Sequence, residues 1–136
     1  MGALTGIRII DVGLLVQGPQ AGQTLADLGA EVIKIENPND GGDMARDVGP
    51  FFFEEHDSVF FHSLNRNKKS FTLDLTQPES AAVLHDLVRS ADALSSNLRG
   101  DVPDKLGLTY EHLKTHNPKI VCAHLSAYGR KGPRAN

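Results

Sequence analysis

The chain has 136 residues, 40% of them hydrophobic and 23% charged, which predicts one soluble domain with a hydrophobic core. Its formal net charge of −3 excludes the overall positive field typical of nucleic-acid-binding proteins. No apolar run is long enough to span a bilayer, and the N-terminus lacks the features of a signal peptide. The single cysteine, Cys122, excludes an internal disulfide framework and suits a reducing compartment. We therefore expect a cytoplasmic protein with no membrane and no nucleic-acid partner.

The first elements form a strand–helix–strand unit. Residues 7–12 (IRIIDV) are short and largely β-branched, which is typical of a buried strand. A helix is expected from Pro19 to a stop at Gly29, and residues 30–36 (AEVIKIE) predict a second strand. Such a unit pairs two parallel strands through a right-handed crossover.

The middle of the chain begins with a polar, Gly-rich loop over residues 37–50. Residues 51–61 carry five of the six phenylalanines, so we expect this segment to be buried against a partner or a further part of the chain. A strand is predicted over residues 70–75, and an amphipathic helix over residues 76–91 with Thr76 as its cap.

The last elements repeat the alternation. Residues 92–97 predict a strand, residues 109–116 a short helix capped by Thr109, and residues 119–129 a strand that runs into a glycine turn. Alternating strands and helices indicate an open, mostly parallel α/β sheet flanked by helices. Ligands of such sheets bind beyond the carboxyl ends of the strands, so the turns that follow strands are the candidate sites.

The turn after the first strand, DVGLLVQGPQAG, carries Gln17 where a phosphate-binding loop would carry glycines. A side-chain amide there can donate to a developing oxyanion in acyl transfer. The alternative is a glutamine that faces solvent. Glu36 ends the second strand, where a dinucleotide-binding domain places an acid for the ribose hydroxyls. The G-x-G-x-x-G fingerprint of that domain is absent, because four residues separate Gly13 from Gly18.

Other charged residues give weaker signals. Arg66, Lys68 and Lys69 precede a strand and could hold a polyanion such as a nucleotide phosphate; the alternative is a solvated basic turn. His112 and His116 have helical spacing but no third ligand nearby, so we expect a surface pair and no metal site. Four acidic residues are candidates for acid–base catalysis but lie in loops with no specific partner: Asp43, Asp47, Glu54 and Glu55.

Four segments together resemble one family, the family III (CaiB/BaiF) CoA transferases. They are LTGIRIIDV…GP…LADLGAEVIKIENP, NRNKKSFTLDL, ADALSSNLR, and LGLTYEHLKTHNPKIVCAHLSAYGRKGP, and they occur in the family's order over nearly the whole chain. The resemblance implies a Rossmann-like α/β domain that binds coenzyme A, and two chains interlocked in a dimer. It also implies transfer of CoA from an acyl-CoA to a carboxylic acid through an aspartyl intermediate, with CoA thioesters as substrates and no tightly bound cofactor.

The resemblance assigns roles to the residues of the first turn and of the basic segment. Gln17 matches a glutamine that lies over the reaction centre and stabilises acyl intermediates, and Val16 lines the same place. Lys68, with Leu64 and Asn65 before it, matches the basic segment beside CoA.

Further positions carry over less evenly. Asn97 and Leu98 match an Asn-aromatic pair that touches CoA, although Leu98 lacks the ring. Lys105 stands where an arginine binds CoA phosphate, and Asn37 stands where the family usually has a nucleotide-contacting arginine. Tyr128 takes the family's aromatic position near the reaction centre.

The family's nucleophilic aspartate follows the Y-G-x-x-G-P segment in a P-G-[YF]-D motif, which these residues do not contain. We therefore interpret residues 1–136 as the N-terminal, CoA-binding part of a longer enzyme, expected to be inactive alone. Acyl-CoA racemases share the opening motifs and remain an alternative, as does a noncatalytic CoA-binding subunit that pairs with a homologue. A dinucleotide-binding module is a more distant alternative.

Overall fold

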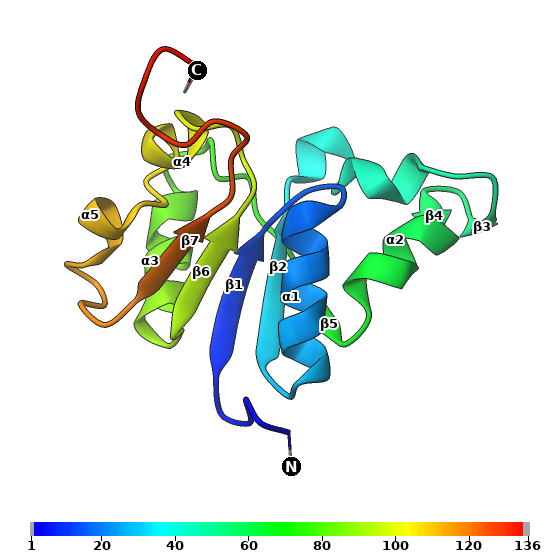
Figure 1. Ribbon diagram of the computed structural model, residues 1–136, viewed down its shortest axis with the longest axis horizontal. Coiled ribbons are helices and arrows are strands. Elements are labelled where there is room, and N and C mark those ends of the chain that lie inside the picture. Colours follow the sequence, from blue (N-terminus) through cyan, green and yellow to red (C-terminus); the bar gives the residue numbers. More distant parts are fainter. Residues whose placement is uncertain (1, 135–136) are drawn as a thin grey trace.

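The computed structural model describes residues 2–134, which form a five-stranded sheet with helices on both faces (Figure 1). The strand order is β5-β2-β1-β6-β7, and every neighbouring pair is parallel. The strands are β1 (Arg8–Val12), β2 (Glu31–Glu36), β5 (Lys68–Thr72), β6 (Ala93–Ser96) and β7 (Val121–His124). The expected open parallel α/β sheet is confirmed.

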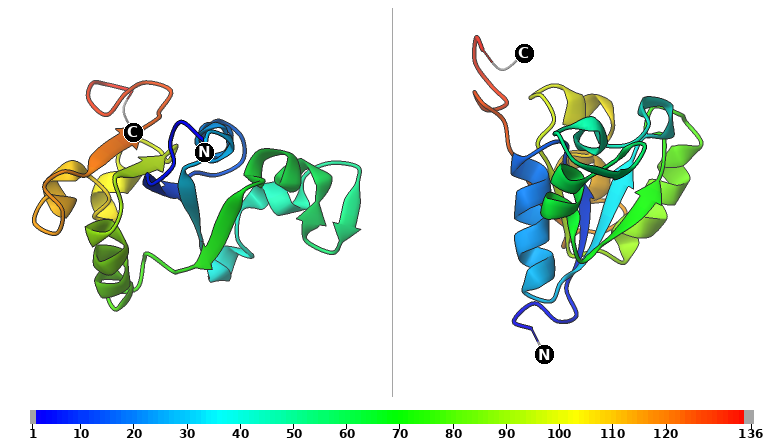
Figure 2. Two further views of the ribbon diagram at one scale, coloured as in Figure 1. Left: turned by 90° about the horizontal axis from the view of Figure 1, so that it is seen from below. Right: turned by 90° about the vertical axis from the view of Figure 1, so that its right-hand side faces the viewer.

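The helices form two layers around this sheet (Figure 2). Helix α1 (Gln17–Asp27) covers one face, and α3 (Ser80–Arg89) covers the other together with the short α4 (Val102–Lys105) and α5 (Tyr110–Leu113). Beyond β5 lie the hairpin of β3 (Phe52–Glu54) and β4 (Asp57–Ser58) and helix α2 (Val59–Asn65), which contacts α1. Two 3₁₀ turns, η1 (Pro38–Asp40) and η2 (Met44–Asp47), follow β2.

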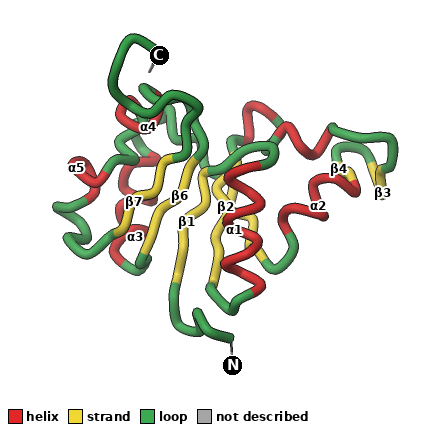
Figure 3. The backbone as a smooth tube through the Cα atoms, in the orientation of Figure 1, coloured by secondary structure: helices red, strands yellow, loops and turns green. Residues whose placement is uncertain are grey.

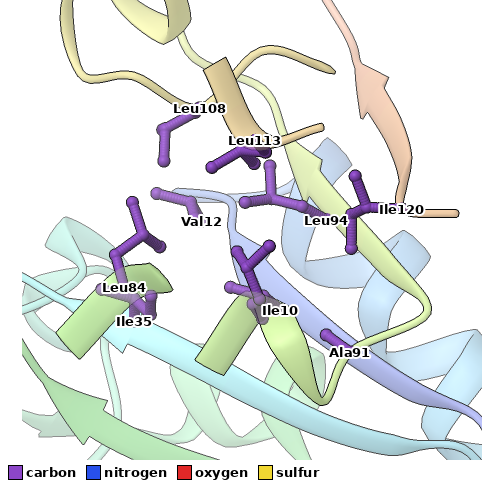
Figure 4. Close-up of a cluster of buried hydrophobic side chains, with 10 residues drawn as sticks. Ile10, Val12, Ile35, Leu84, Ala91, Leu94, Leu108, Leu113 and Ile120 are labelled. Atoms are coloured by element: carbon purple, nitrogen blue, oxygen red, sulfur yellow. The ribbon is translucent and has the colours of Figure 1, made fainter. Parts of the chain in front are cut away.

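Alternation along the strands divides the core into two clusters, because successive side chains point to opposite faces. Ile9 and Val32 pack beneath α1. Ile10 and Leu94 point the other way and join the side chains of α3 and α5 in the larger cluster (Figure 4). Both faces of the central strands are therefore covered, as parallel sheets require.

Several boundaries differ from the sequence-based expectation. Helix α1 begins at Gln17, two residues before Pro19. Strand β5 begins at Lys68 because Asn67, at φ 63°, turns the chain there. Helix α3 begins at Ser80 and not at Thr76, because the Asp74 carboxylate accepts hydrogen bonds from the Thr76 amide and hydroxyl and holds a turn.

The C-terminal elements are shorter than expected. The helix predicted over residues 109–116 spans only Tyr110–Leu113, with Thr109 at the N-cap position. The last strand ends at His124, and α4 was not anticipated in the segment RGDVPDK. Figure 3 shows that loops make up most of the edge at which the strands end.

The aromatic segment is only partly buried. Phe61 is 6% exposed, but Phe51 and Phe53 are 71% and 67% exposed within the described residues.

No helix in residues 2–134 is both long and apolar enough to cross a membrane.

The larger cluster provides a test of the fold. Leu94→Ala in the full-length protein should lower the free energy of unfolding by about 3 kcal/mol, because Leu94 is fully buried between two layers. Leu28→Ala, at a 45% exposed position, should change it by less than about 1 kcal/mol. Urea denaturation followed by circular dichroism measures both, and equal losses would contradict the assignment of the core.

Candidate active site

Several of the candidate residues lie at the carboxyl edge of the sheet, the upper edge in Figure 1. Val16 and Gln17 follow β1, Asn37 follows β2, and Asn97 follows β6. This edge of an open α/β sheet is where ligands bind. The expectation that the post-strand turns converge is met by the topology.

A layer of buried polar side chains lies beneath this edge. Alternation places Asp11 of β1 and Lys34 of β2 on the face covered by α1, next to the apolar Ile9 and Val32. Asp11 is fully buried, and Lys34 is only 1% exposed. Charged groups at such depth must find partners in the protein.

Two ion pairs provide these partners. The Lys34 Nζ atom lies 2.8 Å from Asp43 Oδ2, and the Lys68 Nζ atom lies 2.8 Å from Asp11 Oδ2. Burial lowers the pKa of Lys68, and the neighbouring Asp11 opposes this effect. Asp43 was expected to lack a specific partner, and this expectation is wrong. Its carboxylate extends from the loop after β2 and pairs with Lys34 in the buried polar layer.

The ion pairs also hold the turn after β1. Asp11 accepts a hydrogen bond from the Gly13 amide at 2.8 Å, and Asp43 accepts one from the Leu15 amide at 2.9 Å. Lys34 donates to the Gly13 carbonyl at 2.6 Å. Leu15 adopts φ 63°, a left-handed conformation that costs about 1–2 kcal/mol for a residue with a side chain. The surrounding charges stabilise this strained turn.

Asn97 completes the support from the neighbouring strand β6. Its Oδ1 accepts from the Leu14 amide at 2.7 Å, and its Nδ2 donates to the Leu14 carbonyl at 2.8 Å. The same Nδ2 lies 3.3 Å from Gln17 Oε1. Gln17 itself is exposed at the first position of α1.

Glycines in this region make space for the support and do not form a phosphate loop. A Cβ at Gly18 would lie 2.9 Å from Asn97 Oδ1 and 2.8 Å from the Gly13 Cα. A Cβ at Gly22 would lie 2.6 Å from Asp11 Oδ2. The spacing of Gly13, Gly18 and Gly22 therefore follows from the packing of α1 over the ion pairs and Asn97.

Glu36 has an internal partner. Its carboxylate accepts from Arg46 Nε and Nη2 at 2.8 and 2.9 Å and from the Ser70 hydroxyl at 2.9 Å. Burial raises the pKa of Glu36, but the bonds from Arg46, Ser70 and the Asp43 amide outweigh it and hold the pKa below its usual value. This acid anchors the loop after β2, so its position at a strand end does not indicate a ribose contact.

An apolar cavity of about 350 Å³ opens at this edge on the α3 side of the turn. Leu14, Leu98 and Asn37 contribute to its wall, and Val102 and Leu106 from the α4 region face them. Its size falls in the range of small-molecule sites. Two of these wall residues are close to the candidate residues in sequence: Leu14 bonds to the Asn97 side chain through its backbone, and Leu98 follows Asn97.

The remaining candidates have different surroundings, and Leu64 and Lys68 lie before and at the start of β5, not at the carboxyl edge. Lys68 is only 2% exposed at its side chain, and its Nζ also donates to Pro19 O and Asn65 Oδ1. Lys105 is exposed and pairs with Asp101 at 2.7 Å. Leu64 is half-buried in α2, and Tyr128, 64% exposed, lines a separate hollow with Arg99.

The histidines form no metal site in the part of the chain that the structure describes. His116 stacks on His85 with ring centroids 3.7 Å apart, and His112 accepts or donates a hydrogen bond with Thr109 at 2.8 Å. Thr109 therefore stands at the predicted cap position but bonds to a side chain.

The segment after β5, residues 73–76, also lines the cavity and was not among the predicted site residues. Its signal was present, since these residues follow a predicted strand and so reach the carboxyl edge. The error came from extending that strand to Leu75.

The Glu36–Arg46 contact makes a pH-dependent prediction. A carboxyl whose pKa is lower in the folded state contributes stability above its unfolded pKa and loses it as the pH falls through the folded value. Arg46→Gln removes the contact that most lowers the pKa of Glu36, so this pKa should rise and acid unfolding should begin at higher pH. The free energy of unfolding should fall by about 3 kcal/mol at pH 7. Acid titration by circular dichroism tests this. Arg89→Gln, at an exposed pair with Asp86, is the control and should leave the acid limb unchanged.

Comparison with known proteins identifies the family of this chain. CoA-transferase family III matches residues 4–136. Succinate–glutarate CoA-transferase of Agrobacterium fabrum is 44% identical over 138 residues, which cover 98% of this chain and 34% of that protein. The alpha subunit of succinyl-CoA–L-malate CoA-transferase of Chloroflexus aurantiacus is 40% identical over 130 residues, covering 96% of this chain and 30% of that protein.

A solved structure has the same fold. The crystal structure of a CaiB/BaiF family protein from Brucella suis superimposes with a TM-score of 0.89 at 38% identity, covering 98% of this chain and 36% of that one. The chain thus spans about a third of the length of the relatives that it matches. The chain belongs to CoA-transferase family III.

Proposed function

We propose that this chain is the N-terminal, CoA-binding part of an enzyme that transfers coenzyme A from an acyl-CoA donor to a carboxylic acid. The observation that carries this proposal is the apolar cavity at the carboxyl edge of the sheet, which is walled in part by Leu14 of the turn that also bears Gln17. Family membership and the transferase names of the relatives support it.

Coenzyme A has apolar and polar parts that suit this edge of the sheet. The leucine and valine walls of the cavity offer contact to the adenine ring or the pantetheine chain, and Asn37 offers hydrogen bonds at its rim. The thioester end would then extend toward Val16 and Gln17. Lys68 supports the floor of this site through Asp11, and Lys105 and Tyr128 flank it as further candidate contacts.

The chemistry proposed for Gln17 is hydrogen-bond donation to the acyl oxygen. When a carboxylate attacks the thioester carbonyl, negative charge moves to that oxygen before the C–S bond breaks and the CoA thiolate leaves. A donor amide that is already in position stabilises this charge. The nucleophilic aspartate is expected beyond residue 136, so we expect these residues alone to be inactive.

We further propose that the whole enzyme acts as a dimer, either of two copies or with a homologous chain. The alpha subunit among the relatives gives the second arrangement a precedent. The substrates are an acyl-CoA and a carboxylic acid, and no tightly bound cofactor is required for the steps above.

The ligand class is testable by titration. The full-length protein should bind CoA more tightly than NAD or FAD. The backbone of the turn after β1 already bonds to the buried charged side chains, so it cannot bind a pyrophosphate as a glycine loop does. Isothermal titration calorimetry with the three ligands measures this order. Tighter binding of NAD would contradict the CoA proposal.

The role of Gln17 is testable by kinetics. Gln17→Ala in the full-length enzyme should reduce kcat by about 10²-fold, the loss typical of one oxyanion donor, with a smaller change in KM for acyl-CoA. Gln20→Ala, at an exposed position of the same helix, is the matched control and should keep the wild-type kcat. Exchange of CoA between succinyl-CoA and a panel of carboxylates, followed by mass spectrometry, gives both constants. An unchanged kcat in Gln17→Ala would remove Gln17 from the mechanism.

A further inference from the structure

We infer that Asn97 is a positioning residue that fixes which end of the Gln17 amide faces the substrate. This inference rests on the proposed function of Gln17 as a hydrogen-bond donor. It adds a role for Asn97 that is distinct from contact with CoA.

The orientation of the Asn97 amide follows from its backbone partners. The Leu14 N–H can only donate, so the Asn97 atom at 2.7 Å from it must be the oxygen. The Leu14 carbonyl can only accept, so the atom at 2.8 Å from it must be the nitrogen. A flipped amide would place like groups together at both contacts.

This fixed orientation determines that of Gln17. The Asn97 Nδ2 has two hydrogens; one is used by the Leu14 carbonyl, and the other is available to Gln17, whose Oε1 lies 3.3 Å away. A glutamine that accepts this bond through Oε1 presents its Nε2 hydrogens away from Asn97. The acyl oxygen proposed to bind there would therefore meet donors, as stabilisation of an oxyanion requires.

The approach of Asn97 is built into the fold. Gly18 leaves the space that Asn97 occupies, since a Cβ there would lie 2.9 Å from Oδ1. Strands β1 and β6 are adjacent and parallel, with Val12 opposite Ser96. Asn97, the first residue after β6, therefore lies beside the turn after β1, to which it bonds. The Asn97 side chain is half-buried, whereas Gln17 is exposed, so the support comes from the protein side of the site.

Asn97→Asp tests the inference in the full-length enzyme. The carboxylate still accepts from the Leu14 N–H but cannot donate to Gln17 Oε1. Gln17 should therefore turn its Nε2 group toward the carboxylate, which leaves Oε1 facing the substrate. We expect kcat to fall by about 10²-fold, as for Gln17→Ala, while KM for succinyl-CoA changes by less than about threefold.

A double-mutant cycle separates positioning from an independent contact. If Asn97 acts through Gln17, adding Asn97→Asp to Gln17→Ala should lower kcat by no more than about twofold further. Multiplication of the two losses would overturn the inference and leave the role of Gln17 intact. A wild-type kcat in Asn97→Asp would also overturn it. An unchanged kcat in Gln17→Ala would instead reject the proposed function.

The control is Asn117→Asp. Asn117 Nδ2 donates to the carbonyls of Val88 and Ala91 at 3.0 and 2.7 Å, at the other end of β6, so the variant loses comparable backbone bonds away from the site. It should lower the melting temperature without changing kcat.

A second measurement does not depend on the stability of the Asn97 variant. In a crystal structure of the wild-type full-length enzyme with bound CoA thioester, Gln17 Oε1 should accept from Asn97 and Nε2 should face the thioester carbonyl. Separation of the two amides in that complex would overturn the inference.

Discussion

The buried ion pairs beneath α1 are the constraint on which the rest of this site depends. Lys34–Asp43 and Lys68–Asp11 place four charges where water does not reach, and removal of any one would leave its partner uncompensated at a loss of about 3–5 kcal/mol. Such pairs add little net stability compared with apolar packing. Their consequence here is geometric, because the same carboxylates and the Lys34 ammonium bond to the backbone of residues 13–15.

That geometry explains how this turn is held in place without being a glycine loop. A dinucleotide-binding turn keeps its backbone amides free for pyrophosphate. In this chain, Asp11, Asp43 and Asn97 accept the amide hydrogens of three successive residues, 13, 14 and 15. The backbone is therefore already occupied, and a side chain at the following helix start, Gln17, is left to meet the ligand. The glycines that remain serve the packing of α1.

Much of the fold could be predicted from the sequence, because short apolar strands and amphipathic helices are local patterns. The first parallel pair of strands followed from residues 7–12 and 30–36, and the open parallel sheet followed from the alternation of strands and helices along the chain. The boundaries near Asn67 and Asp74 could not, since a left-handed residue and a side-chain turn shift the start of β5 and α3. Within the site, Gln17 was found from its position in the turn after the first strand, and Asn97 was found through the resemblance. Asp43 was missed because its partner Lys34 is nine residues away in a strand, and nothing local links them.

The buried polar layer can be recognised in the sequence from the alternation of side chains along the strands. Asp11 and Lys34 are charged residues inside otherwise apolar strands, and on a parallel sheet covered on both faces such residues must be buried. Opposite charges at corresponding positions of neighbouring strands would be expected to pair, yet Asp11 and Lys34 stand in register and each takes a different partner. The reason is that flanking elements provide other partners. Asp43, in the loop after β2, pairs with Lys34, and Lys68, in the edge strand β5, pairs with Asp11. Each pair thereby fastens a distant segment to the first turn, so the site at the carboxyl edge is assembled only when the sheet and its flanking loop are both in place.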